Sequence, residues 1–156
     1  MAIFIPGIRC AISGQTIESA DDAVVFSAFV SNQADPLHVF SDAVVHIETF
    51  RKHPLATKAQ KRYEEFRMRT APKARLCRIC GRQITDPDDY FGLGFLVDNT
   101  SHQLYRFNYA HFHRSCLARW PERQTLIHHL ESFDQSGAWQ GDGLKWLIRQ
   151  LRRVSK

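Results

Sequence analysis

The chain has 156 residues, 44% of them hydrophobic, and its 21 Lys and Arg exceed its 16 Asp and Glu to give a formal net charge of +5. This length suits one ordinary domain or two very small ones, and a module of about 60 to 70 residues often needs a metal or a disulfide to supplement its core. No apolar stretch approaches about 18 residues, so the sequence predicts no membrane span. The positive charge admits nucleic acid, acidic protein surfaces or anionic lipid as partners and does not choose among them.

The four cysteines indicate a reducing compartment. The first ten residues, MAIFIPGIRC, contain no apolar run long enough for a signal segment, and without such a segment paired cysteines more often bind metal than form bridges. We therefore expect a cytoplasmic protein with free thiols. The cysteines are Cys10, Cys77, Cys80 and Cys116.

The first candidate motif is half of a metal-binding knuckle. Cys10-x-x-Ser13-Gly14 has the spacing of such a knuckle, but a serine stands where a second thiolate is expected. Two β-prone runs follow, residues 23–30 and 36–41, and the turn-forming residues between them predict a β-hairpin. Pro54 then predicts a break before a second helical stretch.

A complete knuckle follows the basic segment 67–76. Cys77-x-x-Cys80-Gly81 offers two thiolates to one ion, and the glycine allows a tight turn after them. The runs 90–97 and 103–110 again predict a hairpin, and a helix is expected from near His113, with Pro121 forcing a break.

The two halves of the chain align at an ungapped offset of 67 residues. Residues 10–66 and 77–133 share 15 identities in 57 pairs, at glycine, proline, apolar and candidate-ligand positions. We interpret this as a tandem duplication. The identical pairs are Cys10/Cys77, Ile12/Ile79, Gly14/Gly81, Ile17/Ile84, Asp21/Asp88, Asp22/Asp89, Val30/Val97, Asn32/Asn99, Leu37/Leu104, Phe40/Phe107, Ala43/Ala110, His46/His113, Pro54/Pro121, Glu64/Glu131 and Phe66/Phe133.

The offset also predicts a metal site in the second copy. His113-x-x-Cys116 supplies a second ligand pair, so Cys77, Cys80, His113 and Cys116 form the set of a closed structural zinc site. The first copy keeps Cys10 and His46 and has the neutral hydroxyls of Ser13 and Thr49 at the other two positions, which are poor zinc ligands. The sequence therefore predicts one zinc per chain, in the second copy, and an empty degenerate site in the first. The alternative is that the cysteines are buried free thiols that act as small hydrophobic residues.

The C-terminal residues 141–156 predict a basic amphipathic helix. Leu144, Leu147, Ile148 and Leu151 share one face, after a glycine-rich break at 141–143. We expect this helix to pack on the core, and docking to a partner or to a membrane surface is the alternative.

The order of knuckle, hairpin and helix resembles treble-clef zinc fingers, and Cys-x2-Cys followed by His-x2-Cys resembles the first zinc site of LIM domains. The 32-residue spacer is longer than LIM domains usually have, and the second LIM ligand pair is absent. The resemblance implies an α+β fold of two tandem treble-clef units, with a structural zinc and a binding role. The expected parts are a metal-free unit in 1–70, a zinc-binding unit in 71–140 and the terminal helix in 141–156, fused into one globular domain with a shared core.

The function expected from these features is non-enzymatic protein binding, for example as a bacterial immunity or adaptor protein. A nucleic-acid-binding zinc-finger regulator is the main alternative, because arginines and exposed aromatic residues such as Tyr105 or Trp139 suit phosphates and bases.

Catalysis is the minor alternative. An HNH-like nuclease would need further histidines such as His111, His128 or His129, and a nucleophilic Cys10 beside His46 is geometrically possible. A zinc site with four protein ligands leaves no position for an activated water, which argues against zinc hydrolysis.

Overall fold

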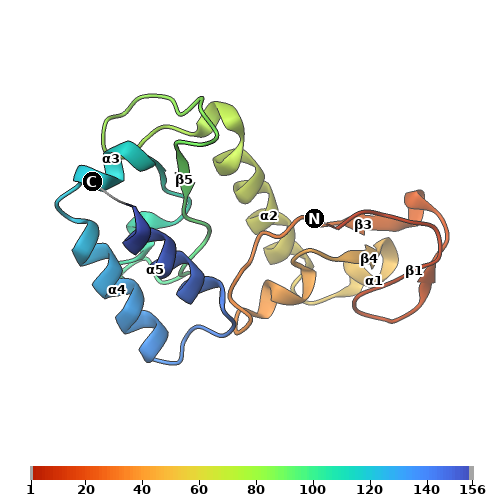
Figure 1. The fold of residues 1–156 in the computed structure, drawn as a ribbon. Coiled ribbons are helices and arrows are strands. Elements are labelled where there is room, and N and C mark those ends of the chain that lie inside the picture. The colour runs from red at the N-terminus through yellow and green to blue at the C-terminus, as the bar shows by residue number, and fades with distance from the viewer. Residues whose placement is uncertain (1, 155–156) are drawn as a thin grey trace. The chain divides into compact units, whose positions relative to one another are not determined.

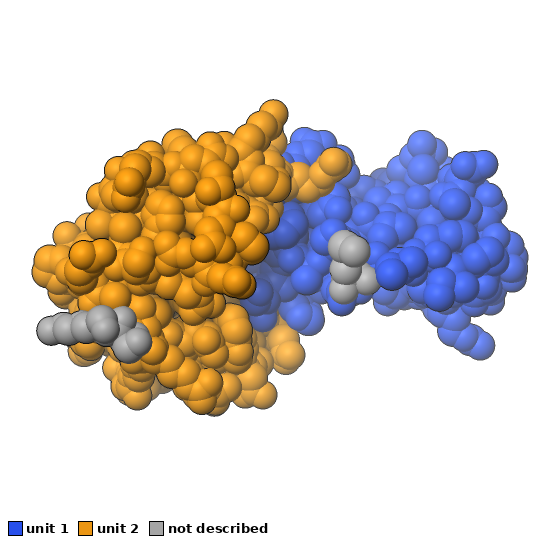
Figure 2. All heavy atoms as spheres, turned by 45° about the horizontal axis from the view of Figure 1, so that its top comes forward, with its two compact units in different colours: residues 1–31, 35–66 blue, residues 32–34, 67–156 orange. Residues whose placement is uncertain are grey.

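The protein is described by a computed structural model, and the residues it describes are 2–154. The fold mixes α and β structure, with five α-helices and small antiparallel two-stranded sheets among these residues (Figure 1). The chain divides into two compact units, shown in different colours in Figure 2. Unit 1 comprises residues 1–31 and 35–66, and unit 2 comprises residues 32–34 and 67–156.

Unit 1 is built on two short hairpins followed by two helices. The first hairpin pairs Ile8 with Ile17, and the second pairs Val24 with Val45, in each case antiparallel. In chain order the elements are β1 (Ile8–Arg9), β2 (Thr16–Ile17), the 3-10 helix η1 (Ala20–Asp22), β3 (Ala23–Val25), the 3-10 helix η2 (Pro36–Phe40), β4 (Val44–His46), α1 (Ile47–Lys52) and α2 (Ala56–Thr70), whose last residues belong to unit 2.

Unit 2 repeats this order at an offset of 67 residues. Its hairpin pairs Phe91 with Phe112, the counterparts of Val24 and Val45, and the bridge between Leu76 and Gln83 takes the place of the first hairpin. The elements are η3 (Pro72–Ala74), β5 (Tyr90–Gly92), η4 (Tyr105–Phe107), β6 (His111–His113), α3 (Arg114–Arg119), α4 (Arg123–Gln135) and α5 (Gly143–Arg153). The strands of this hairpin and α3 have the bounds of β3, β4 and α1 shifted by 67 residues, so the repeat found in the sequence is also present in the backbone.

The predicted hairpins are correct only in part. Three residues of each predicted first strand form a strand, and the predicted second strands are wrong. The segments 36–41 and 103–110 contain the 3-10 helices η2 and η4, and the strands that pair with β3 and β5 are β4 and β6. In unit 1 the Asp35 carboxylate accepts a hydrogen bond from the backbone N–H of Leu37 and starts the turn, with Pro36 at its first position. Asp42 and Tyr109, one in each unit, then take left-handed conformations with φ of 55° and 56°, which reverses the chain before each strand.

The prolines break the helices as predicted. Pro54 separates α1 from α2, and Pro121 separates α3 from α4. No helix among residues 2–154 has the length and apolar character needed to cross a membrane.

Each unit has a hydrophobic core of its own. The core of unit 1 includes five large apolar residues around a cluster of aromatic rings centred on Phe26. These residues are Phe26, Phe29, Val44, Val45 and Phe50. The fused domain with a shared core stays a prediction, as do the boundaries at 70 and 140.

The C-terminal helix α5 packs on the core of unit 2. The four predicted apolar residues, Leu144, Leu147, Ile148 and Leu151, are buried there, whereas Trp146 is 54% exposed. The expectation that this helix completes the core is confirmed.

Candidate metal centre

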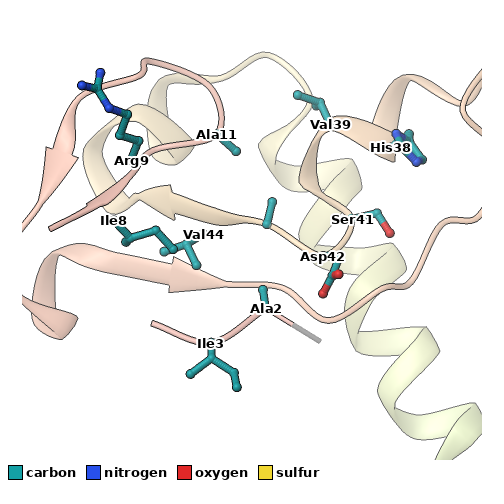
Figure 3. A pocket seen from close by; sticks show the side chains of 11 residues that line it. Ala2, Ile3, Ile8, Arg9, Ala11, His38, Val39, Ser41, Asp42 and Val44 are labelled. Atoms are coloured by element: carbon teal, nitrogen blue, oxygen red, sulfur yellow. The ribbon is translucent and has the colours of Figure 1, made fainter. Parts of the chain in front are cut away.

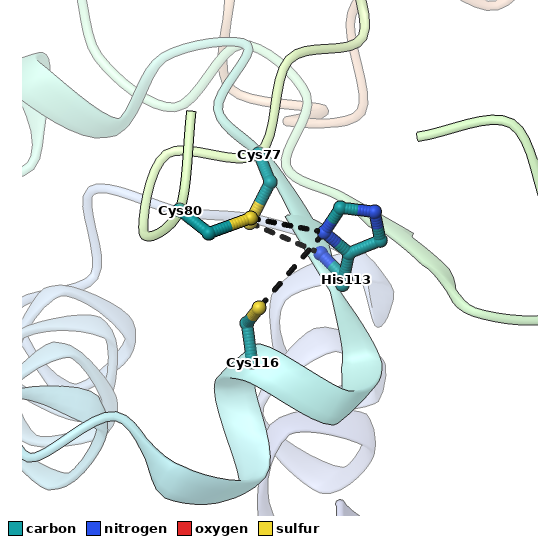
Figure 4. Close-up of side chains that lie close together, drawn as sticks. All are labelled: Cys77, Cys80, His113 and Cys116. Carbon is teal, nitrogen blue, oxygen red and sulfur yellow. Dashed lines mark hydrogen bonds between the residues drawn. The ribbon is translucent and has the colours of Figure 1, made fainter. Parts of the chain in front are cut away.

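The knuckle of unit 2 places two thiols on one tight turn. The backbone N–H of Cys77 donates to the carbonyl of Arg82 (2.8 Å), and the N–H of Gly81 donates to the carbonyl of Cys77 (2.7 Å). Gly81 has a φ of 70°, a left-handed conformation that favours glycine. The turn directs the side chains of Cys77 and Cys80 toward the same point (Figure 4).

The second ligand pair comes from the junction of β6 and α3. His113 is the last residue of β6 and the N-cap of α3, and Cys116 lies in the first turn of that helix. The backbone N–H of His113 donates to Sγ of Cys77 (3.4 Å), which ties this junction to the knuckle. The four predicted ligands are thus brought together from two separate segments of the chain.

The four side chains lie close enough together to share one metal ion. One ligand atom from each of Cys77, Cys80, His113 and Cys116 lies within 4.8 Å of all the others. Nδ1 of His113 is 3.5 Å from Sγ of Cys80 and 3.9 Å from Sγ of Cys116 (Figure 4). Zinc bonds of about 2.3 Å to sulfur and about 2.0 Å to nitrogen place tetrahedral ligand atoms about 3.5 to 3.8 Å apart. The donor set and its spacing therefore fit a metal ion of this kind.

The electrostatics of the cluster also suit a cation. Hydrogen bonding from the backbone N–H of Arg82 is the main effect that lowers the pKa of Cys80 to about 6. Burial, together with the neighbouring Cys80 and Cys77, raises the pKa of Cys116 to about 11. Three close thiols cannot all ionise without a counter-charge, and a bound cation would supply it.

Asp89 positions the helix that carries Cys116. Its carboxylate accepts hydrogen bonds from the backbone N–H (2.8 Å) and the hydroxyl (2.9 Å) of Ser115, and its carbonyl accepts one from the N–H of Arg114 (2.7 Å). Burial opposes ionisation of Asp89, but the bonds from Ser115 outweigh it and lower the pKa of this carboxyl. The sequence alignment paired Asp89 with Asp22 but assigned it no role.

The corresponding residues of unit 1 are held by hydrogen bonds. The backbone N–H groups of Ser13 (3.4 Å) and His46 (3.3 Å) donate to Sγ of Cys10, which is 2% exposed. Nδ1 of His46 accepts the backbone N–H of Glu48 (3.3 Å) and so caps α1. Thr49 lies in α1, at the position of Cys116 in α3. Among residues 2–154, the cluster in unit 2 is the one group of three or more His, Cys, Asp or Glu side chains close enough to share an ion.

The histidines considered for catalysis occupy other environments. His111 is buried between two partners: its Nε2 donates to the carbonyl of Arg69 (2.7 Å), so its Nδ1 accepts from the hydroxyl of Tyr90 (3.1 Å). His128 and His129 are neighbours on α4, away from the set of metal ligands.

Comparison of the chain with protein-family models, with curated proteins and with solved structures finds no significant match.

Proposed function

We propose that Cys77, Cys80, His113 and Cys116 bind one zinc ion with a structural role. The convergence of four soft or borderline ligands within 4.8 Å is the observation that carries this proposal. Three thiolates and one imidazole fill a tetrahedral shell, so no coordination position is left for water or substrate. The metal then cross-links the knuckle to the junction of β6 and α3, and we propose that the protein is not an enzyme.

Unit 2 is, on this proposal, a zinc-bound treble clef, and unit 1 is a degenerate copy that folds without metal. The shared backbone hydrogen bonds support this interpretation. The knuckle turn recurs at 10–14 and at 77–81, and its link to β4 in unit 1 recurs as a link to β6 in unit 2. The capping bond of His46, whose Nδ1 accepts the backbone N–H of Glu48, supports the metal-free state of unit 1.

The role we propose is binding of a protein partner in a reducing cytoplasm, as in an immunity or adaptor protein. Unit 1 supports it, because Ile3, Ile5 and Val39 are 66%, 64% and 42% exposed. Ile3 and Val39 line a groove of about 460 Å³ that also contains Ile8 and Val44 (Figure 3). Exposed apolar surface around a hollow is typical of a protein-binding site.

Nucleic-acid binding is the second candidate, and the distribution of charge favours it for unit 2. Unit 2 contains fifteen Lys and Arg against eight Asp and Glu, whereas unit 1 contains six against eight. The formal charges are therefore +7 and −2, and all the excess positive charge of the chain lies in unit 2.

Elemental analysis of the full chain tests the zinc site. We expect one zinc per chain, lost in Cys80→Ser and retained in the matched variant Cys10→Ser. Two zinc ions per chain would contradict the interpretation that the site of unit 1 is degenerate. No zinc would contradict the whole metal assignment.

Capture from the native host tests the protein-binding role. Protein captured by the wild type and by Arg106→Val, but not by Val39→Arg, would place the contact on unit 1. Equal capture by all three would contradict a role for the groove.

A further inference from the structure

The two units carry the same surface hollow, and its chemistry differs between them. A pocket of about 330 Å³ in unit 2 is lined by nine residues, and eight of these have counterparts 67 positions earlier that line the groove of unit 1 (Figure 3). The paired residues, unit 1 first, are Ala2/Arg69, Arg9/Leu76, Ala11/Arg78, Val39/Arg106, Ser41/Asn108, Asp42/Tyr109, Ala43/Ala110 and Val44/His111.

Three arginines replace small or apolar residues in the unit 2 hollow. Arg69, Arg78 and Arg106 stand where unit 1 has Ala2, Ala11 and Val39, and no Asp or Glu lines the pocket. The unit 1 groove has one positive and one negative side chain, Arg9 and Asp42, and so no formal charge of its own. We call this hollow of unit 2, lined by Arg69, Arg78 and Arg106, the arginine pocket.

Buried groups hold the arginines in place. The Cζ atoms of Arg78 and Arg106 lie 5.1 Å and 4.7 Å from the ring centroid of Phe107, which is 1% exposed. The backbone N–H of Arg78 donates to the carbonyl of His111 (2.8 Å). The imidazole of His111 donates to the carbonyl of Arg69 (2.7 Å). Two of the guanidinium groups therefore share one aromatic ring, and His111 fixes the backbone of the third arginine.

Such a pocket is unfavourable without an anion. Three guanidinium groups around one hollow repel one another. The ion pair between Arg106 and Glu122 is long (3.7 Å), and both side chains are more than half exposed. An exposed pair of this kind contributes little and exchanges readily. A phosphate bound among the arginines would remove the repulsion and accept charge-assisted, bidentate hydrogen bonds.

We propose that the arginine pocket binds a backbone phosphate of nucleic acid. The formal charge of +7 on unit 2 favours a polyanion over a single small anion. Twelve of the fifteen basic residues of this unit are arginines, which recognise phosphate by a planar fork. Tyr105, next to Arg106, is 42% exposed and available to stack on a base. This inference rests on the second candidate function above and adds its site.

The unit 1 groove supplies the substitutions for the test. Arg78→Ala with Arg106→Val installs the residues that unit 1 has at these positions, so the same fold accommodates them. Lys145→Ala with Arg149→Ala removes the same charge from exposed residues of α5 in the same unit and is the matched control.

Fluorescence anisotropy with labelled single-stranded RNA and duplex DNA of about 20 nucleotides, long enough for a site of several nucleotides, measures the binding. We expect the pocket variant to bind at least about tenfold more weakly. We expect its slope of log Kd against log salt, between about 50 and about 200 mM, to fall by about 2, with a much smaller loss of affinity in the control.

Equal losses in the pocket variant and the control would overturn the assignment of a site, because diffuse attraction would then explain the binding. No binding of either oligonucleotide at low salt would overturn it as well, as would binding only of a phosphorylated peptide. Zinc content is measured on the same samples. A zinc-loaded protein that binds no oligonucleotide would refute phosphate binding by the arginine pocket and leave the zinc proposal intact.

Discussion

Units 1 and 2 keep one backbone plan and use it for different chemistry at two places. At the knuckle, unit 2 gathers four side chains that could hold a metal ion, whereas unit 1 has hydroxyl residues at two of these positions and uses its imidazole as a helix cap. At the surface hollow, unit 2 presents three arginines and unit 1 presents apolar side chains. The comparison teaches that the turns and the short hairpin carry the fold, while the side chains placed on them are free to diverge.

The N-terminal caps of α1 and α3 explain why the histidine of unit 2 faces the thiols and the histidine of unit 1 does not. In unit 2 the carboxylate of Asp89 accepts the N–H of Ser115, so Nδ1 of His113 is left to face the thiols. In unit 1 the corresponding N–H, that of Glu48, is accepted by Nδ1 of His46 itself. One imidazole is therefore available as a ligand, and its counterpart is a helix cap.

Removal of the metal should produce the largest difference in stability between the two units. A structural zinc contributes on the order of 10 kcal/mol to folding, so Cys77→Ser or a strong chelator should unfold unit 2. Unit 1 should stay folded, because it has a separate hydrophobic core and lacks two of the four ligand residues. Hydrogen exchange on the full chain measures this as loss of amide protection in 77–135 and retention in 10–66. Equal loss of protection in both units would show that they fold as one cooperative body.

Restoring the missing ligands should make unit 1 resemble unit 2. Ser13→Cys with Thr49→Cys completes the four-ligand set with Cys10 and His46, and we expect the zinc content to rise from one to two per chain. His46 would have to give up the N–H of Glu48, which costs about 1 kcal/mol and is small beside the gain from zinc. Ser13→Cys alone, with three ligands, is the control and should bind the second zinc far more weakly. An unchanged zinc content in the double variant would mean that the knuckle of unit 1 has lost the ligand geometry as well as the ligands.

The features predicted correctly from the sequence are those set by short-range patterns. The ligand pairs depend on spacings of three residues within one turn, and the prolines act on the helix that they interrupt, so both could be predicted locally. The second strands of the hairpins were mispredicted, because the aromatic residues of 36–41 and 103–110 reach the core from 3-10 helices that are followed two residues later by a left-handed residue. No residue pattern in those segments distinguishes such a turn from a strand.

The arginine pocket was missed for a different reason. Its arginines come from three places along the chain, and only the fold brings Arg69 and Arg78 to the same hollow as Arg106. The basic segment 67–76 was noted in the sequence, but Ala2, the counterpart of Arg69, precedes the aligned region that begins at residue 10. The contrast in charge therefore emerges only when the two hollows are compared in space.

The cap on α3 should contribute less than the metal. Asp89→Ala removes the acceptor for the N–H and hydroxyl of Ser115, and the loss of an N-cap costs about 1 kcal/mol. We expect thermal unfolding of unit 2 at a lower temperature and a weaker zinc affinity, measured by competition with a chelator. Asp22→Ala is the matched control in unit 1, where His46 caps the helix, and it should have the smaller effect. Equal effects of the two substitutions would contradict the difference in capping.

The smallest expected effect concerns the thiol that unit 1 retains. Burial of Cys10 opposes its ionisation, but hydrogen bonds from the Ser13 hydroxyl and from the backbone N–H groups of Ser13, His46 and Ile12 outweigh burial and lower its pKa from 9.0 to about 7. The folded protein thus favours the thiolate. It follows that this group adds stability as the pH rises from about 7 to about 9, and that this stability is lost as the pH falls through 7. In the zinc-loaded protein the other three thiols are metal ligands, so thiolate absorbance reports Cys10 alone, with Cys10→Ser as the blank. We expect a midpoint near 7 in the wild type and a higher one in Ser13→Ala. A wild-type midpoint near 9 would mean that these hydrogen bonds do not stabilise the Cys10 thiolate.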